Sequence, residues 1–127
     1  MKRVRAGRPE TMEREAFNAV CAALPGAHNV IQWGGASVWK IGPKGPVFAI
    51  HSRWGEAEGV VLKPTEMARE IWRDTPGVGL APYLGRAGWI KIDAGAMTDE
   101  DLRGLIETSH EINLAKLSKA ARAAISG

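Results

Sequence analysis

The residues best suited to chemistry lie close together in the stretch from Pro76 to Asp93. This stretch carries the only tyrosine of the chain, Tyr83, followed closely by Arg86, Trp89 and Lys91. Arginine and lysine bind phosphate or carboxylate groups, and aromatic rings stack on planar groups. Glycines and prolines recur in its first part and predict a loop of fixed course that leads into a strand. We therefore expect a recognition surface at this loop.

Signatures of catalysis and metal binding are missing from the sequence. The standard nucleotide-binding, hydrolase and zinc motifs do not occur. His28, His51 and His110 lie far apart, and none has metal-ligand spacing to another histidine or to Cys21. The acidic run 99–101 is explained by helix capping at the start of a predicted helix. We predict no enzyme activity, no metal and no cofactor.

The charge of the chain is unevenly distributed. The chain has 127 residues, a formal net charge of +3 and a pI near 9.3. This length is typical of one domain with a continuous core. Without four basic residues near the N-terminus, the remainder carries a net charge of −1. We predict a basic disordered tail over residues 1–10 and a single domain over residues 11–127. The four basic residues are Lys2, Arg3, Arg5 and Arg8.

Cysteine content and hydropathy favour a cytoplasmic protein. Cys21 has no partner for an intrachain disulfide, which is typical of a reducing compartment. The basic N-terminus is followed by no apolar run of the kind found in a signal peptide. No stretch approaches the roughly 20 apolar residues of a membrane helix. We expect a soluble protein without a membrane partner.

Helical periodicity and capping residues predict three helices and a short final one. Thr11 would cap the first, whose apolar stripe includes Cys21 and ends at Leu24; this makes Cys21 a small buried hydrophobe. The longest begins at Thr98 and runs to about Leu117. The second helix begins near Pro64 or Thr65, and its expected buried side consists of Met67, Ala68, Ile71 and Trp72. The last helix, 119–125, follows its cap Ser118 and has few apolar side chains to bury.

Alternating hydrophobicity between turn residues predicts antiparallel strands. In the last strand Trp89, Lys91 and Asp93 share one face, while Ile90 and Ile92 face the core. The fold class is therefore α+β, with an antiparallel sheet of about five strands flanked by helices, an N-terminal helix and a long C-terminal helix. The expected strands are 29–33, 36–41, 47–52, 58–63 and the run that begins at Trp89.

The tryptophans allow two interpretations. Trp72 belongs to a helix face and is expected in the core. Trp33, Trp54 and Trp89 each lie at a strand end or beside glycine, where partial exposure is expected. They could fill the seam between sheet and helices, which is the commoner role, or line a groove. For Trp89, which shares a strand face with Lys91, we favour the exposed position.

Several short motifs follow one another in a recognisable order, from about Thr11 to Ala124. They are Leu24-Pro25-Gly26-Ala27, Val38-Trp39-Lys40-Ile41-Gly42 with Val47-Phe48-Ala49, Val61-Leu62-Lys63-Pro64, Pro76-Gly77-Val78 with Pro82-Tyr83-Leu84-Gly85-Arg86, Gly88-Trp89-Ile90, and Ser109-His110 with Lys116-Leu117-Ser118-Lys119. In order and spacing they resemble the MmcQ/YjbR-like family.

This resemblance implies a compact α+β domain that has been compared with a double-wing DNA-binding arrangement. It also implies DNA binding by basic and aromatic residues around the sheet and the loop before its last strand. The chain departs from the pattern at Ala87, where many relatives carry histidine or another large residue. The residues at the matching positions are Lys40, Lys63, Tyr83, Arg86, Trp89 and Lys91.

Two functions from different classes follow. The first is a non-enzymatic DNA-binding, or nucleic-acid-binding, domain, monomeric and without a membrane partner. The alternative is a small-ligand or protein-binding domain with a pocket around Tyr83, Arg86 and Trp89, since arginine beside aromatic rings also binds carboxylates and planar molecules.

Overall fold

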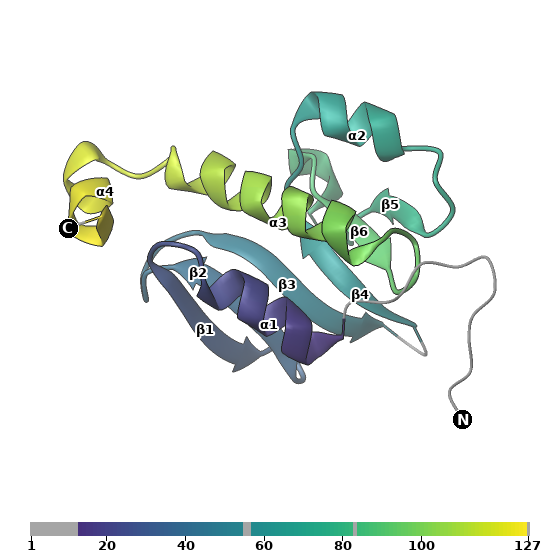
Figure 1. The fold of residues 1–127 in the computed structure, drawn as a ribbon, viewed down its shortest axis with the longest axis horizontal. Helices are drawn as coiled ribbons and strands as arrows, with labels where there is room; N and C mark the ends of the chain where they lie inside the picture. Colours follow the sequence, from purple (N-terminus) through teal and green to yellow (C-terminus); the bar gives the residue numbers. More distant parts are fainter. Residues whose placement is uncertain (1–12, 55–56, 83, 127) are drawn as a thin grey trace.

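The fold is known from a computed structural model that describes residues 13–54, 57–82 and 84–126 (Figure 1). The expected tail and the expected cap Thr11 lie outside these residues. The elements in chain order are α1 (Arg14–Ala22), β1 (Ala27–Gln32), β2 (Ala36–Ile41), β3 (Val47–Trp54), β4 (Ala57–Leu62), α2 (Glu66–Trp72), β5 (Val78–Leu80), the 3-10 turn η1 (Gly85–Ala87), β6 (Ile90–Asp93), α3 (Asp99–Leu114) and α4 (Lys119–Ser126).

The strands form one antiparallel sheet in the order β1-β2-β3-β4-β6-β5. The predicted α+β class is confirmed. The sheet has six strands because Val78–Leu80, which we expected in the loop, pairs with β6. This strand is three residues long and has Gly79 at its centre, so it shows no alternation that a sequence pattern could reveal.

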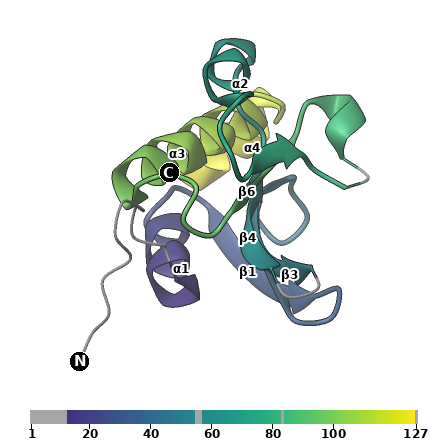
Figure 2. The same cartoon turned by 90° about the vertical axis from the view of Figure 1, so that its right-hand side faces the viewer.

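Helices α1 and α3 cover one face of the sheet (Figures 1 and 2). Phe17 and Cys21 of α1 are fully buried there, together with Ile106 of α3. Ile90 and Ile92 also lie in this core, as the alternation of β6 predicted. Each buried aliphatic or aromatic side chain of this kind contributes roughly 1.5–3 kcal/mol, so the seam between these helices and the sheet holds the domain together.

The capping residues predicted from the sequence are confirmed at three helices. Thr65 Oγ1 accepts a hydrogen bond from Ala68 N, and Thr98 Oγ1 accepts one from Asp101 N. Ser118 Oγ accepts one from Ala121 N in the same way. Helix α3 ends at Leu114, somewhat before the predicted Leu117.

The predicted buried side of α2 is partly wrong. Ala68 and Trp72 pack against the core, but Met67 and Ile71 are exposed. The apolar residues of this short helix form two adjacent stripes, and only one of them packs against the core. Periodicity identifies apolar stripes, whereas the tertiary fold decides which of them has a partner.

Helix α4 has a contact with the core that the sequence did not predict. The Ile125 side chain packs against the core and lies so close to Gly26 that a Cβ there would stand 3.0 Å from Ile125 Cγ2. Gly26 also has a φ of 74°, which side chains rarely adopt. In the described part of the chain, no helix has the length and apolar character needed to cross a membrane.

Candidate functional site

The open face of the sheet, opposite α1 and α3, carries a second apolar cluster. The loop before β6 folds back on itself, since Ala81 N donates to Trp89 O at 3.1 Å and Trp89 N donates to Leu84 O at 3.3 Å. As a result Trp89 is only 8% exposed. We call these residues the open-face cluster: Ala36, Val38, Ile50, Val61, Ala81 and Trp89.

The prediction that Trp89 is exposed is therefore wrong. Its strand face was correct, because it lies on the face opposite Ile90 and Ile92. On that face Trp89 packs in the open-face cluster against residues of neighbouring strands and Ala81, so both faces of the sheet are buried at this point. Its ring is therefore not presented for stacking.

Two of the predicted site residues, Lys63 and Arg86, lie together with Arg69 around a small hollow of about 180 Å³. We call Lys63, Arg69 and Arg86 the basic cluster. They come from three separate segments: the residue directly after β4, helix α2 and the turn η1. Pro64, Glu66, Ala87 and Gly88 complete the lining.

Two hydrogen bonds from Lys63 to distant segments, together with local backbone features, position the basic cluster. The backbone N of Lys63 donates to Ser109 Oγ at 2.9 Å, and its Nζ donates to Ala87 O. Arg69 belongs to the helix that Thr65 caps. Arg86 lies in η1, which ends at Gly88 with a φ of 89°. The cluster thus rests on a strand end, a capped helix and a glycine-terminated turn.

Gly88 leaves space for the cations. A Cβ at this position would stand 2.8 Å from Lys63 Nζ and 3.5 Å from Arg69 Nη1. The two charged groups therefore approach the same point of the backbone. Glycine satisfies both the positive φ and the close approach of the two cations.

The charges of the basic cluster are poorly balanced. Glu66 is the single carboxylate that lines the hollow. Among residues 13–54, 57–82 and 84–126, neither Arg69 nor Arg86 forms an ion pair. Converging cations with one carboxylate between them favour an external anion, and guanidinium groups suit the paired oxygens of phosphate or carboxylate.

The other predicted site residues do not join the basic cluster. Lys40 lies on β2, opposite His28, and its Nζ donates to Pro43 O at 2.8 Å. Lys91 Nζ forms an ion pair with Asp93 Oδ1 at 2.9 Å. Tyr83 lies outside the described residues. Arg86 lines the hollow of the basic cluster but Trp89 does not, so the alternative pocket around Tyr83, Arg86 and Trp89 has no support from the Trp89 ring.

Arg69 was missed by sequence reasoning. The one available signal was its place in the helix that starts at Glu66, shortly after Lys63, in the turn following the Thr65 cap. Nothing in the sequence shows that this turn lies against η1, because that contact depends on the return of the chain through β5 and the loop.

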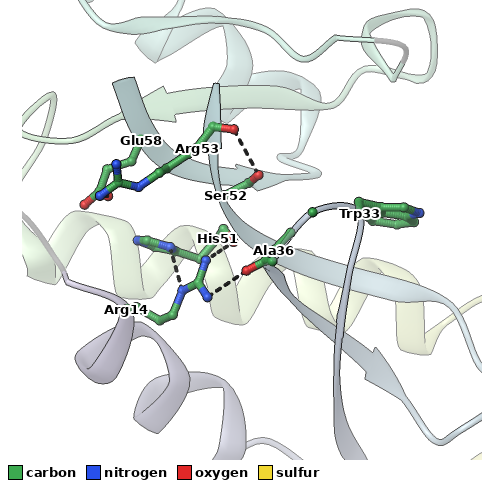
Figure 3. A pocket seen from close by; sticks show the side chains of 9 residues that line it. Arg14, Trp33, Ala36, His51, Ser52, Arg53 and Glu58 are labelled. Atoms are coloured by element: carbon green, nitrogen blue, oxygen red, sulfur yellow. Dashed lines mark hydrogen bonds and ion pairs between the residues drawn. The ribbon is translucent and has the colours of Figure 1, made fainter. Parts of the chain in front are cut away.

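His51 and His110 serve packing and hydrogen bonding. Figure 3 shows His51 beside Arg14, whose Nε donates to His51 Nδ1 at 3.3 Å and whose Nη2 donates to His51 O at 3.2 Å. Burial lowers the pKa of His51, and the Arg14 guanidinium lowers it further. A ring nitrogen of His110 lies 2.8 Å from Pro25 O, and its ring meets Phe48 edge to face.

Cys21 is fully buried, and burial raises the pKa of its thiol. This is the inert environment expected of a small core hydrophobe. In the part of the chain that the structure describes, no group of three or more potential ligands could hold a metal ion.

Comparisons with known proteins agree with this fold. A family model described as YjbR matches residues 22–112, which include the whole basic cluster. The crystal structure of Deinococcus radiodurans protein DR2400, whose domain is named DUF419, is similar with a TM-score of 0.76 and 21% sequence identity. The match covers 88% of this chain and 86% of that chain, and at this identity it shows the fold alone. No curated protein matches the chain.

Proposed function

The chain belongs to the YjbR family, and on that premise we propose that it is a non-enzymatic domain that binds DNA through the basic cluster. The observation that carries the proposal is the convergence of Lys63, Arg69 and Arg86 around one hollow with Glu66 as its single carboxylate. A phosphate group of the DNA backbone would supply the missing negative charge.

Binding of this type is electrostatic and largely independent of sequence. Phosphate contacts give position and affinity but read no bases. Lys40 and Lys91 would contact further phosphates away from the basic cluster. To do so, Lys40 must release the Pro43 carbonyl and Lys91 must release the Asp93 carboxylate. Tyr83 remains the predicted stacking residue of the loop, while Trp89 holds the loop in place. We expect a dissociation constant of about 1–100 µM at physiological salt.

We also propose that the domain has no enzyme activity. This is supported by His51, whose Nδ1 accepts a hydrogen bond from Arg14, and by Cys21, whose thiol is buried. We also propose that the domain acts as a monomer in the cytoplasm, where a single buried cysteine requires no disulfide partner.

Fluorescence anisotropy with labelled single- and double-stranded DNA across a salt series tests the proposal. The double variant Arg69→Gln/Arg86→Gln should bind more weakly than the wild type. Its slope of log K against log salt should be less steep by about 0.9 for each lost contact to B-DNA. Arg73→Gln is the matched control, because Arg73 also lies near α2 but is exposed and paired with Glu70.

Three outcomes would contradict this assignment. Equal affinity and salt slope in wild type and double variant would exclude the basic cluster as the binding surface. Loss of binding in a chain that begins at Pro9 would assign DNA binding to the basic N-terminus. A small anionic metabolite that raises the melting temperature of the wild type but not of Arg86→Ala would indicate a small-ligand site instead.

A further inference from the structure

The hollow of the basic cluster is too small to enclose a nucleoside. Its volume is about 180 Å³, whereas pockets that enclose small organic ligands usually hold about 300–1,000 Å³. A single phosphate group fits into this space, and the sugar and base attached to it have to remain outside. The hollow therefore takes one anionic group of a larger ligand.

The lining of the hollow carries an excess of two positive charges. Its cations are Lys63, Arg69 and Arg86, and its single carboxylate is Glu66. Within residues 13–54, 57–82 and 84–126, Glu66 forms an ion pair with none of these cations. A dianion balances this excess, whereas a group with one negative charge leaves half of it uncompensated.

Two of the cations are held close together at Gly88. Lys63 Nζ and Arg69 Nη1 both approach the position of a Cβ on this glycine, at 2.8 and 3.5 Å. Both side chains are half-buried and Gly88 is buried, so water screens their mutual repulsion less than it would on an open surface. A doubly charged anion bound between them offsets this repulsion.

Internal and terminal phosphates of DNA differ in charge and in free oxygens. An internal phosphodiester carries one negative charge, has two free oxygens and is joined to a sugar on either side. A terminal phosphomonoester carries a charge of about −1.5 to −2 at pH 7 and has three free acceptor oxygens. It is joined to one sugar only, so it can enter a narrow hollow end-on. The terminal group thus matches the charge excess, the three cations and the small volume.

We propose that the hollow binds the terminal phosphate of a DNA strand. This inference rests on the proposed DNA binding and specifies which phosphate the basic cluster holds. The guanidinium groups of Arg69 and Arg86 pair with the phosphate oxygens. Lys63 Nζ keeps its bond to Ala87 O and directs its remaining N–H donors to the same group.

Fluorescence anisotropy with three forms of one single-stranded oligonucleotide tests the proposal. The label is internal, and the 5′ end carries a hydroxyl, a phosphate or a methylphosphate; a second set carries the same groups at the 3′ end. In at least one set, the full chain should bind the phosphate form at least about tenfold more tightly than the hydroxyl form. The methylphosphate should lose most of this gain, because it has one negative charge and two free oxygens.

Three variants test the role of the lining. Arg69→Gln/Arg86→Gln should bind all three forms with equal affinity. Glu66→Gln removes the single carboxylate and should bind the phosphate form about two- to fivefold more tightly, a gain that misfolding cannot produce. Arg73→Gln, which loses an arginine paired with Glu70 outside the hollow, should keep the preference of the wild type.

A free phosphomonoester offers the same chemistry as a strand end. Thymidine 5′-monophosphate, added as a competitor, should displace the phosphorylated strand only at concentrations at least about tenfold above the dissociation constant of the strand, because it lacks the further phosphates of the strand. If the mononucleotide binds as tightly as the strand, the hollow is a site for a small phosphorylated molecule and the proposal is wrong.

The proposal is also overturned if the phosphate form binds no better than the hydroxyl or methylphosphate form at both ends. Persistence of the preference in the double variant, or no gain in Glu66→Gln, would contradict it as well. If all forms bind the wild type equally and the double variant more weakly, this inference fails while DNA binding by the basic cluster stands. If no form binds at low salt, the proposed function fails too.

Discussion

The Ser109 hydroxyl of α3 bridges β3 and the end of β4 at a point where the two strands form no backbone hydrogen bond. The pairing of these strands begins with Ala49 opposite Leu62, and Phe48 lies at a bulge where β2 offers it no partner. Beyond that end, Ser109 Oγ donates to Phe48 O at 2.6 Å and accepts from Lys63 N at 2.9 Å. One hydroxyl thus satisfies a carbonyl of β3 and the N–H that follows β4.

The variant Ser109→Ala should leave both backbone groups without a partner. Ser109 and Phe48 are fully buried, so water replaces the hydroxyl poorly. An unpaired buried polar group costs about 1–3 kcal/mol. Two such groups, with some relaxation of the strand ends, should lower the free energy of unfolding by about 2–4 kcal/mol.

Urea denaturation followed by tryptophan fluorescence measures this loss. Ser52→Ala is the matched control, because Ser52 is partly exposed and its Oγ makes only a 3.4 Å contact with Arg53 O. The control should change the free energy of unfolding by less than about 0.5 kcal/mol. The reasoning is refuted if Ser109→Ala and Ser52→Ala have the same midpoint and the same m-value.

Two further predictions concern buried titratable groups. Burial and the neighbouring Arg14 lower the pKa of His51 below its usual 6.5, so the unfolded chain takes up the proton first as pH falls. The stabilising contribution of neutral His51 should therefore be fully present above about pH 6.5 and should be lost as the pH falls toward the lower pKa of the folded state. Urea midpoints measured between pH 7.5 and 5 should fall in the wild type and fall less in His51→Gln. A pKa of His51 at or above 6.5, measured by NMR titration of the folded protein, would contradict this prediction. Burial raises the pKa of Cys21, so its thiol should react with a disulfide reagent only on unfolding; rapid reaction of the native protein would show that the residue is accessible.

Local features of the chain were predictable from the sequence. The caps Thr65, Thr98 and Ser118 depend on a side chain and a backbone N–H three residues away. The burial of Cys21 follows from its place on a helical stripe, and that of Ile90 from strand alternation. These properties require no knowledge of distant segments, and the order of motifs was enough to indicate the YjbR family.

Properties that depend on a distant partner were not predictable. Strand β5 exists because β6 pairs with it. Met67 is exposed because nothing in the described part covers its side of α2. Trp89 was assigned to the correct face, but the residues that bury it there, such as Val38 and Ile50, come from other strands and meet it only in the folded chain.

The candidate site divides in the same way. The sequence alone identified Lys63 and Arg86 as cationic residues near the loop, since their residue types and motifs are local. Only the tertiary structure brought Arg69 to them, through the packing of α2 beside η1. It likewise separated Lys40 from the group, because β3 lies between β2 and β4. Residue type determines which charges the chain carries, and the course of the backbone decides which of them meet.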